Sequence, residues 1–523
     1  MLVALLLLVY LVVGWRGRDP LKFTSGDDMI YLALSHSLES GSYRDIHLAG
    51  APLHVKYPPV YPVWLMLVRQ ATGEHADLML AANLGLVAIS FAMLFGVARR
   101  LAGPWLAMCL ILLLTLQPGL LWVGGSLYAE ALFLLLSTGT LVAALRADAS
   151  GGRAPYAAIA LALLTFLTRS AGLALVLAVG VWLWTRRKRV ELIVYGVASS
   201  LVVGGWFGWV AMAASGATDR SYARDITAGA AAVPRGPLQN LSHHVWQNVL
   251  SYATGILPTE LSLPTIPGTR ADNLFWLAVN LVLLTAGMAV LWRAWRAAAA
   301  YLLLYAGLLV AWLWPINRLV DPLVPLILLT MLLGAWRLTE RLPTRARAVA
   351  LGCLIALVTL GTARGAISRL EEYRLCDRTK PETSAGCYDP EEVSVAAAST
   401  YLREHSNVDD VVLSDMNAGV YYLSGRRGTS AAALTQAAPG AAAQILREKH
   451  VRYVLLTAWS SFQRIAMAQA LLASCRELRL EGSFAPHALL LTPAPQSDSG
   501  DNACTALNRF IAENPERVHP DQR

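Results

Sequence analysis

The feature that most constrains this fold is a series of apolar runs, each close to the length needed to cross a lipid bilayer. The first run, MLVALLLLVYLVVGW, starts at Met1, and similar runs recur as far as about residue 364. A membrane-spanning helix needs roughly 20 mostly apolar residues. In a chain of 523 residues that is 56% hydrophobic and 15% charged, these runs predict a polytopic α-helical membrane protein rather than a soluble one.

We predict about eleven membrane spans from the length and spacing of these runs. They lie near residues 1–16, 78–98, 103–122, 127–145, 155–168, 170–185, 190–213, 272–291, 298–314, 319–336 and 348–364. The fifth and sixth are short, and Arg169 separates them. The first run has neither a basic leading region nor a small-residue cleavage site, so we expect a retained helix rather than a signal peptide.

The basic connections between the runs predict how the chain is oriented in the membrane. The segments ARR before Leu101, RADASGGR, RRKR at Arg186–Arg189, RAWRA and RLTERLPTRAR all fall on one side of the predicted bilayer. The positive-inside rule makes that side cytoplasmic, together with the N-terminus. Topology therefore explains most of the net charge of +8, and we do not expect nucleic-acid binding. Residues 17–77, 214–271 and the tail then lie outside.

The tail differs from the rest of the chain and predicts a small α/β domain on the outer side. Between about residues 390 and 495, helix and strand patterns alternate. The expected helices are 393–405, 417–425 and 441–450, and the expected strands are 409–415, 451–459 and 487–493. We therefore divide the chain into a membrane domain, 1–365, and an outer domain, 366–523, whose last residues we expect to be loosely ordered.

The six cysteines fit this division. Cys109 and Cys353 fall within spans and are expected to be free thiols. The other four lie outside, where an oxidising compartment would let them pair. We favour Cys376–Cys387 and Cys475–Cys504, although the sequence alone does not establish the connectivity.

The first outer segment carries two adjacent carboxylates. Asp27 and Asp28 begin a stretch with helical spacing of apolar residues, and a second such stretch covers 59–73; both are expected to lie along the membrane surface. One aspartate can be explained as a helix cap that favours the positive end of the helix dipole. A carboxylate beside lipid is nevertheless costly and tends to be functional. Two carboxylates in succession indicate a functional role beyond capping the helix.

Three basic residues are candidates for binding a phosphate. Lys56 precedes Tyr57 and two prolines in KYPP, where stiff backbone aims the side chain in one direction. Arg318 lies at the outer mouth of a span, in WPINRLVDPLVP, and arginine binds phosphate through its planar fork. Each can instead be an interface anchor, with the charge held at the membrane surface. Arg169 is a weaker candidate.

Other polar residues could contact a substrate. Glu130, in SLYAEALF, is expected near the outer end of a helix. His243 and His244 are explained by an ordinary loop, and the alternative is a metal or acceptor contact. The sequence contains no Cys-x-x-Cys, phosphate-binding loop, GxGxxG or GxSxG motif.

Taken in chain order, these motifs resemble the GT-C membrane glycosyltransferases. The acidic pair after the first span, the lysine and prolines about thirty residues later, and the Arg-x-x-x-Pro-x-x-Pro mouth are similar to those of protein O-mannosyltransferases and lipid A aminoarabinose transferases. The tail with YYLSGRRG resembles tails of bacterial members. Two positions depart from the pattern: Asp28 stands where many relatives have Glu, and the chain reads KYPP instead of KPP.

The resemblance implies an inverting transfer of a sugar from a polyprenyl-phosphate carrier to an acceptor hydroxyl of a protein, lipid A or glycan. Asp27 would act as the base, with Asp28 binding the acceptor or positioning Asp27. Lys56 and Arg318, with Arg169 in reserve, would hold the carrier phosphate. The expected acceptor or substrate contacts are Tyr31, Tyr57, Tyr61, Glu130 and His243. No cofactor is required, although a divalent metal is compatible with the residues present.

The resemblance also implies a bacterial cytoplasmic membrane, with the C-terminal domain in the periplasm. Two other classes remain as alternatives. A transporter or lipid flippase would place charges along a path through the bilayer and often shows internal repeats, which are not evident here. An interaction scaffold that uses the tail would leave Asp27, Lys56 and Arg318 unexplained.

Overall fold

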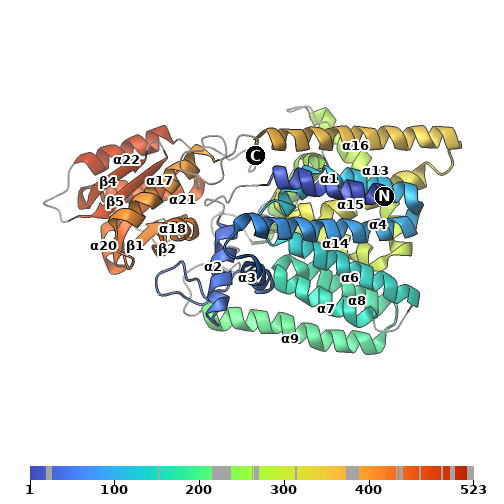
Figure 1. Ribbon diagram of the computed structural model, residues 1–523, viewed down its shortest axis with the longest axis horizontal. Helices are drawn as coiled ribbons and strands as arrows, with labels where there is room; N and C mark the ends of the chain where they lie inside the picture. Colours follow the sequence, from blue (N-terminus) through green and yellow to red (C-terminus); the bar gives the residue numbers. More distant parts are fainter. Residues whose placement is uncertain are drawn as a thin grey trace.

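The computed structural model describes residues 1–18, 26–149, 154–214, 237–261, 263, 270–312, 315–372, 388–431, 434, 440–458, 461–484, 487–494 and 501–514. Long helices run side by side through most of this length, and a small α/β unit (388–514) lies at one end of the bundle (Figure 1). The N-terminus lies at the opposite end (Figure 1). The expected combination of a helical membrane part and an α/β tail is therefore present.

Six helices of the described part are long and apolar enough to cross a membrane. They are α4 (Ala76–Thr115), α6 (Glu130–Ser150), α9 (Arg189–Ala214), α13 (Arg270–Ala294), α15 (Val324–Leu338, with the turns before it) and α16 (Thr344–Glu372). Four apolar helices are shorter: α1 (Leu2–Arg16), α7 (Ala154–Thr168), α8 (Leu173–Thr185, with the turn before it) and α14 (Arg296–Ala311). The predicted count of eleven spans stays a prediction.

These helices differ in how much apolar surface they leave exposed. The apolar window of α15 is 94% buried within the protein, whereas that of α9 is only 11% buried. Helices α9 and α16 lie along opposite sides of the bundle (Figure 1). Leu201 of α9 and Leu360 of α16 are both 71% exposed. Apolar surface of this extent is stable against lipid rather than water.

Two of the predicted spans differ in detail from the helices observed. Residues 78–98 and 103–122 were expected to be separate spans, but α4 joins them across a break at Gly103, where φ is +84° and Pro104 follows. The second part of α4 ends at Thr115, seven residues earlier than expected. The side chain of Gln117 then accepts a hydrogen bond from the Leu120 amide at 2.6 Å and starts a short helix, α5 (Pro118–Gly124).

Close backbone contact between α13 and α15 depends on two glycines. A Cβ atom on Gly287 would lie 1.9 Å from the Thr330 carbonyl oxygen, and one on Gly334 would lie 2.0 Å from that of Leu283. Small residues at such crossings let helix backbones approach within a membrane, where van der Waals packing drives association. The buried position of α15 thus has a local cause in the sequence.

The first outer segment forms two helices where they were expected, and their placement along a membrane surface stays a prediction. Helix α2 (Asp27–Glu39) lies between the bundle and the α/β unit (Figure 1), and α3 (Val60–Thr72) packs against it. Met29 of α2 shares a buried apolar cluster with Ala418 of the α/β unit. Helix α2 therefore connects the two parts of the protein.

The α/β unit is built on a five-stranded sheet of order β2-β1-β3-β5-β4. Its strands are β1 (Val411–Ser414), β2 (Gly428–Ser430), β3 (Val451–Thr457), β4 (Leu478–Phe484) and β5 (Ala488–Pro493). The first three run parallel, and β5 is antiparallel to both β3 and β4. Alternate residues of β3 enter different cores, because Tyr453 and Leu455 face one cluster and Val454 and Leu456 face the other.

In the described part of the α/β unit, five helices cover the two faces of this sheet. Helices α17 (Pro390–His405) and α18 (Asn417–Ser424) contribute to one core, and α20 (Ala442–Glu448), α21 (Ser461–Ala473) and α22 (Asp501–Glu513) contribute to the other. Strands β2 and β4 and helix α21 were not predicted. The expectation of a loosely ordered end is wrong for α22, which buries Leu507 and Phe510 against the sheet.

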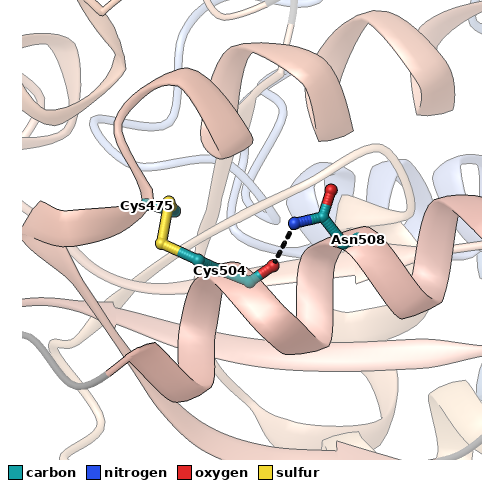
Figure 2. The surroundings of a disulfide bond; sticks show 3 residues. All are labelled: Cys475, Cys504 and Asn508. Atoms are coloured by element: carbon teal, nitrogen blue, oxygen red, sulfur yellow. Dashed lines mark hydrogen bonds between the residues drawn. A yellow bond between two sulfur atoms is a disulfide. The ribbon is translucent and has the colours of Figure 1, made fainter.

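The predicted Cys475–Cys504 disulfide is present and connects the turn before β4 to the first turn of α22 (Figure 2). Cys109 and Cys353 are free, as expected. Cys376 and Cys387 lie outside the described residues, so their pairing stays a prediction.

Candidate functional site

The site begins at the N-terminus of α2. Gly26 precedes the helix with φ of +81°, a left-handed conformation that suits glycine, and Asp27 and Asp28 form its first two positions. The Oδ1 atom of Asp28 accepts a hydrogen bond from the Met29 amide at 2.8 Å, and the residue is only 3% exposed. Asp28 therefore contributes to the start of the helix, whereas the Asp27 side chain lies in a charged cluster.

The KYPP segment (Lys56–Pro59) lies just before α3 and approaches this carboxylate from a second direction. The Tyr57 hydroxyl donates a hydrogen bond to Oδ1 of Asp27. Lys56 is partly buried, and its ammonium group is close enough to influence Asp27 electrostatically. The two residues before the prolines are thus held next to the acidic end of α2.

Arg318 joins Asp27 to Glu130. It lies in a short 3₁₀ turn, Asn317–Leu319, ahead of α15. Its Nη2 donates to Oδ2 of Asp27, and its Nε lies 3.3 Å from Oε1 of Glu130. Its guanidinium also stacks over the ring of Tyr128, 4.9 Å from the centroid, which favours a fixed orientation.

A second arginine completes the cluster. Arg169, in the turn between α7 and α8, forms an ion pair with Glu130, whose side chain is only 1% exposed at the start of α6. Asp27 and Glu130 supply two negative charges, while Arg318, Arg169 and Lys56 supply three positive charges. The cluster can therefore accept a further anion without becoming strongly negative.

A small pocket lies beside this cluster. Its lining comes from the first outer segment, from the turn between α7 and α8, and from α14 and the turns that follow it. The lining residues are Tyr31, Tyr57, Pro58, Arg169, Ser170, Ala171, Leu308, Trp312 and Leu319. Most of these are apolar or aromatic, and Arg169 is the charged member. A lipid-linked anion has this combination of an apolar part and a negative head.

The charges around Asp27 set its protonation. Burial raises the pKa of its carboxyl, but the positive charges of Arg318 and Lys56 and the hydrogen bonds from Tyr57 and Arg318 outweigh that effect and hold the pKa at about 2. Asp27 is thus ionised at neutral pH. Because its negative charge is neutralised by these neighbours, it is also a weak base.

Tyr31 and Tyr61, which were expected to contact a substrate, lie against other aromatic side chains. The Tyr31 ring lies 4.8 Å from the Tyr57 ring and 4.9 Å from the Tyr61 ring, centroid to centroid. Tyr61 is fully buried and accepts a hydrogen bond from Asn83, so it supports the pocket from behind. The His243 side chain lies outside what the structure describes. The neighbouring His244 lies in helix α11 (Pro237–Ser251) and not in the expected loop, and its Nε2 is 2.5 Å from the Trp312 carbonyl oxygen.

Sequence reasoning missed a second buried acidic pair next to the cluster. The carboxyl groups of Glu260, in α12 (Leu257–Glu260), and Asp321 both lie next to Gly119, and the two residues are 9% and 4% exposed. Burial raises the pKa of Glu260. Gly119 makes room for them, since a Cβ there would lie 2.2 Å from Oδ1 of Asp321. The position of Asp321, three residues after Arg318, was the available signal.

Among the described residues there is no group of three or more His, Cys, Asp or Glu side chains arranged to hold a metal ion. The carboxylates of Asp27 and Glu130 each face an arginine instead.

Comparison with known proteins gives a clear answer for the fold. No protein-family profile and no curated protein sequence matches the chain. Among solved structures, ArnT from Cupriavidus metallidurans bound to undecaprenyl phosphate is 14% identical, with a TM-score of 0.56, covering 94% of this chain and 97% of ArnT. The oligosaccharyltransferase of Archaeoglobus fulgidus, tethered to an acceptor peptide, is 13% identical with a TM-score of 0.56, covering 97% of this chain and 77% of that one.

A further structure of the Archaeoglobus fulgidus oligosaccharyltransferase, AglB, holds an inhibitory peptide and a dolichol-phosphate. It is 11% identical with a TM-score of 0.55, covering 97% of this chain and 77% of that one. At these identities the similarity concerns the fold. The protein is a membrane protein with the fold of the GT-C glycosyltransferases, as its sequence motifs predicted.

Proposed function

We propose that this protein is an inverting glycosyltransferase that moves a sugar from a polyprenyl-phosphate carrier to an acceptor hydroxyl at the outer face of a bacterial cytoplasmic membrane. The observation that carries the proposal is the contact of Arg318 with both Asp27 and Glu130, beside a pocket lined by Arg169 and Tyr57. A carboxylate and several cations at one pocket are the two groups that this transfer needs.

The carrier phosphate binds next to Lys56, Arg318 and Arg169. An anion there takes up part of the positive charge that stabilises the ionised form of Asp27. The pKa of Asp27 therefore rises above about 2 when the donor is bound, and its carboxylate becomes a stronger base. Donor binding thus makes Asp27 a stronger base, because the carrier phosphate and the Asp27 carboxylate both interact with the guanidinium of Arg318.

Transfer then proceeds in one displacement. The acceptor oxygen attacks the anomeric carbon from the side opposite the phosphate, and its proton passes to Asp27. The bond from the anomeric carbon to the phosphate oxygen breaks, and its electron pair leaves with the phosphate. The leaving group gains negative charge, which the lysine and arginines stabilise more in the transition state than in the ground state. Tyr31, which lines the pocket, and His243 remain our candidates for acceptor or substrate contacts, and Asp28 binds the acceptor or positions Asp27, whereas the fully buried Tyr61 supports the pocket instead.

Two observations support the proposed orientation, with the site and the α/β unit outside. Trp209, near the C-terminal end of α9, donates a hydrogen bond to the His54 carbonyl in the first outer segment. The basic Arg186–Arg189 turn precedes α9 and so lies at its other end. The charged residues of the site contact one another at one end of the bundle, which favours a transferase over a transporter.

Replacing the base tests the proposal. Purified Asp27→Asn protein should bind undecaprenyl phosphate but transfer sugar from a polyprenyl-phosphate donor at least about 100-fold more slowly than wild type. The acceptor can be read from mass spectra of envelope glycans, lipid A and proteins in cells with and without the gene. Transfer at nearly the wild-type rate would exclude Asp27 as the base.

A further inference from the structure

We propose that His54 is a positioning residue, which holds the KYPP segment in place through the backbone amide of Tyr57 and links it to the α/β unit. The inference extends the proposed function, because the segment carries Lys56 and contacts Asp27. His54 and its partner Asp45 are buried, at 3% and 6% exposure.

The direction of one hydrogen bond fixes the state of the His54 ring. The Tyr57 amide donates to Nε2 of His54 at 2.7 Å. A backbone amide can only donate, so Nε2 carries no proton. The proton of the neutral ring is therefore on Nδ1, which lies 2.7 Å from Oδ1 of Asp45 and donates to it. Asp45 thus selects the form of His54 that can accept from Tyr57.

The Tyr57 amide is important for holding the backbone of the KYPP segment in place. Pro58 and Pro59 have no N–H, so Tyr57 supplies the last backbone donor before α3. Its carbonyl oxygen accepts a hydrogen bond from the Tyr43 hydroxyl at 2.7 Å, and its own hydroxyl reaches Asp27. A shift of the Tyr57 backbone would therefore displace the Asp27 contact, the Lys56 side chain and the pocket wall together.

The loop that contains Asp45 and His54, residues 43–54, also contacts the α/β unit. The amide of Ala49 donates to the carbonyl of Gly428 in β2, and the Gly428 amide donates to the carbonyl of His47, each at 2.8 Å. Residues 47–49 thus cover the edge strand β2, which would otherwise offer open backbone groups. The Asp45 amide donates to Pro52 and the His54 amide donates to Tyr43, closing the loop on itself. The unit therefore rests on the loop that presents His54.

Two substitutions separate the roles of the two ring nitrogens. In His54→Gln, the side-chain oxygen is as many bonds from Cβ as Nε2 and can accept from the Tyr57 amide, but the donor to Asp45 is lost. In His54→Asn, the side-chain nitrogen matches Nδ1 and can donate to Asp45, but nothing reaches the Tyr57 amide. A role limited to Asp45 predicts that Asn substitutes well; the proposed role predicts that Gln does.

Hydrogen exchange at the Tyr57 amide gives a readout that does not depend on activity. A peptide covering residues 55–60 should exchange at least about tenfold faster in His54→Asn than in wild type, and His54→Gln should stay within about threefold of wild type. Affinity for undecaprenyl phosphate should follow the same order, falling at least about tenfold in the Asn variant only. Melting temperatures of both variants identify a general loss of folding.

Equal exchange in the two variants, or better retention by Asn than by Gln, would overturn the proposal. The result is also separable from the proposed function. If the exchange order holds while neither wild type nor variants bind undecaprenyl phosphate, His54 still positions the segment and the choice of donor is wrong.

Discussion

Arg318 and Asp27 form an ion pair across 291 residues of sequence, and the same guanidinium also contacts Glu130. The turn before α15, the start of α2 and the start of α6 meet at this one side chain. The base proposed for the reaction is therefore neutralised in the ligand-free protein by a cation proposed to bind the donor phosphate. Competition between the carboxylate and the phosphate for Arg318 follows from this arrangement.

The planar, forked shape of the Arg318 guanidinium should matter for the transfer rate as well as its positive charge. Arg318→Gln should lower the transfer rate about 30- to 1000-fold, because a cation in a partly dry site is lost. Arg318→Lys keeps a charge but cannot contact two carboxylates at once, so its rate should fall between Gln and wild type. Arg337→Gln, in an exposed pair with Glu340, is the matched control and should leave the rate unchanged. Full activity of Arg318→Lys would show that the fork is dispensable.

Acid should remove the stability that Asp27 contributes. Its pKa of about 2 in the folded protein lies below its ordinary value of 3.8, so its contribution is complete above pH 4 and is lost as the pH falls to 2. A shift of nearly two units corresponds to about 2 kcal/mol at most. We expect Asp27→Asn to melt at a lower temperature than wild type at pH 7, and the difference to shrink between pH 4 and pH 2.5. A constant difference over that window would contradict the folded pKa.

The contact of α13 with α15 predicts a stability effect that depends on position. Gly287→Ala places a methyl group where the Thr330 carbonyl now lies and should cost about 1–3 kcal/mol. Gly307→Ala, in α14, meets no atom within 4 Å and should be neutral or slightly stabilising, because alanine favours helix. Thermal unfolding in one detergent compares the two. Similar melting temperatures would mean that the two helices separate easily.

Much of this arrangement follows from local sequence. The apolar runs predicted the positions of most long helices, and the alternating patterns predicted α17, β1, α18, α20, β3 and β5. Patterns were too weak for β2, which has three residues and depends on its neighbours, and for β4, where Gly482 takes one of the apolar positions of the alternation. Short or polar strands are specified by tertiary contact more than by propensity.

The candidate site was predictable as a set of residues but not as a set of contacts. Asp27, Lys56 and Arg318 were identified by their unusual positions beside proline, glycine and apolar runs. That Glu130 lies between two arginines depends on how α6, α15 and the α7–α8 turn meet, and no local pattern contains that information. Glu260 and His54 were missed for the same reason, because each is defined by a partner distant in structure rather than by its neighbours in sequence.

The Cys475–Cys504 disulfide predicts which cysteines react with a thiol label. In the folded, unreduced protein a maleimide should react with Cys353, which is exposed, and not with the buried Cys109. Reduction should add Cys475 and Cys504 to the labelled set, and also Cys376 and Cys387, for which a second disulfide is predicted. Replacing both by serine should destabilise α22 by about 2–4 kcal/mol, measured as faster proteolysis of the C-terminal end. Labelling of Cys475 without reduction would contradict the bond.

Glu130 and Arg169 form one ion pair, yet their loss should change donor affinity in opposite directions. Glu130→Gln leaves Arg169 and Arg318 without their shared carboxylate, so the cluster becomes more positive and should bind undecaprenyl phosphate at least about threefold more tightly. Arg169→Gln removes a cation from the pocket wall and should weaken binding at least about tenfold. Both variants break a buried pair, so both should melt at lower temperature than wild type. Melting alone therefore cannot explain affinities that diverge, and weaker binding in both variants would mean that Glu130 organises the arginines more than it competes with the phosphate.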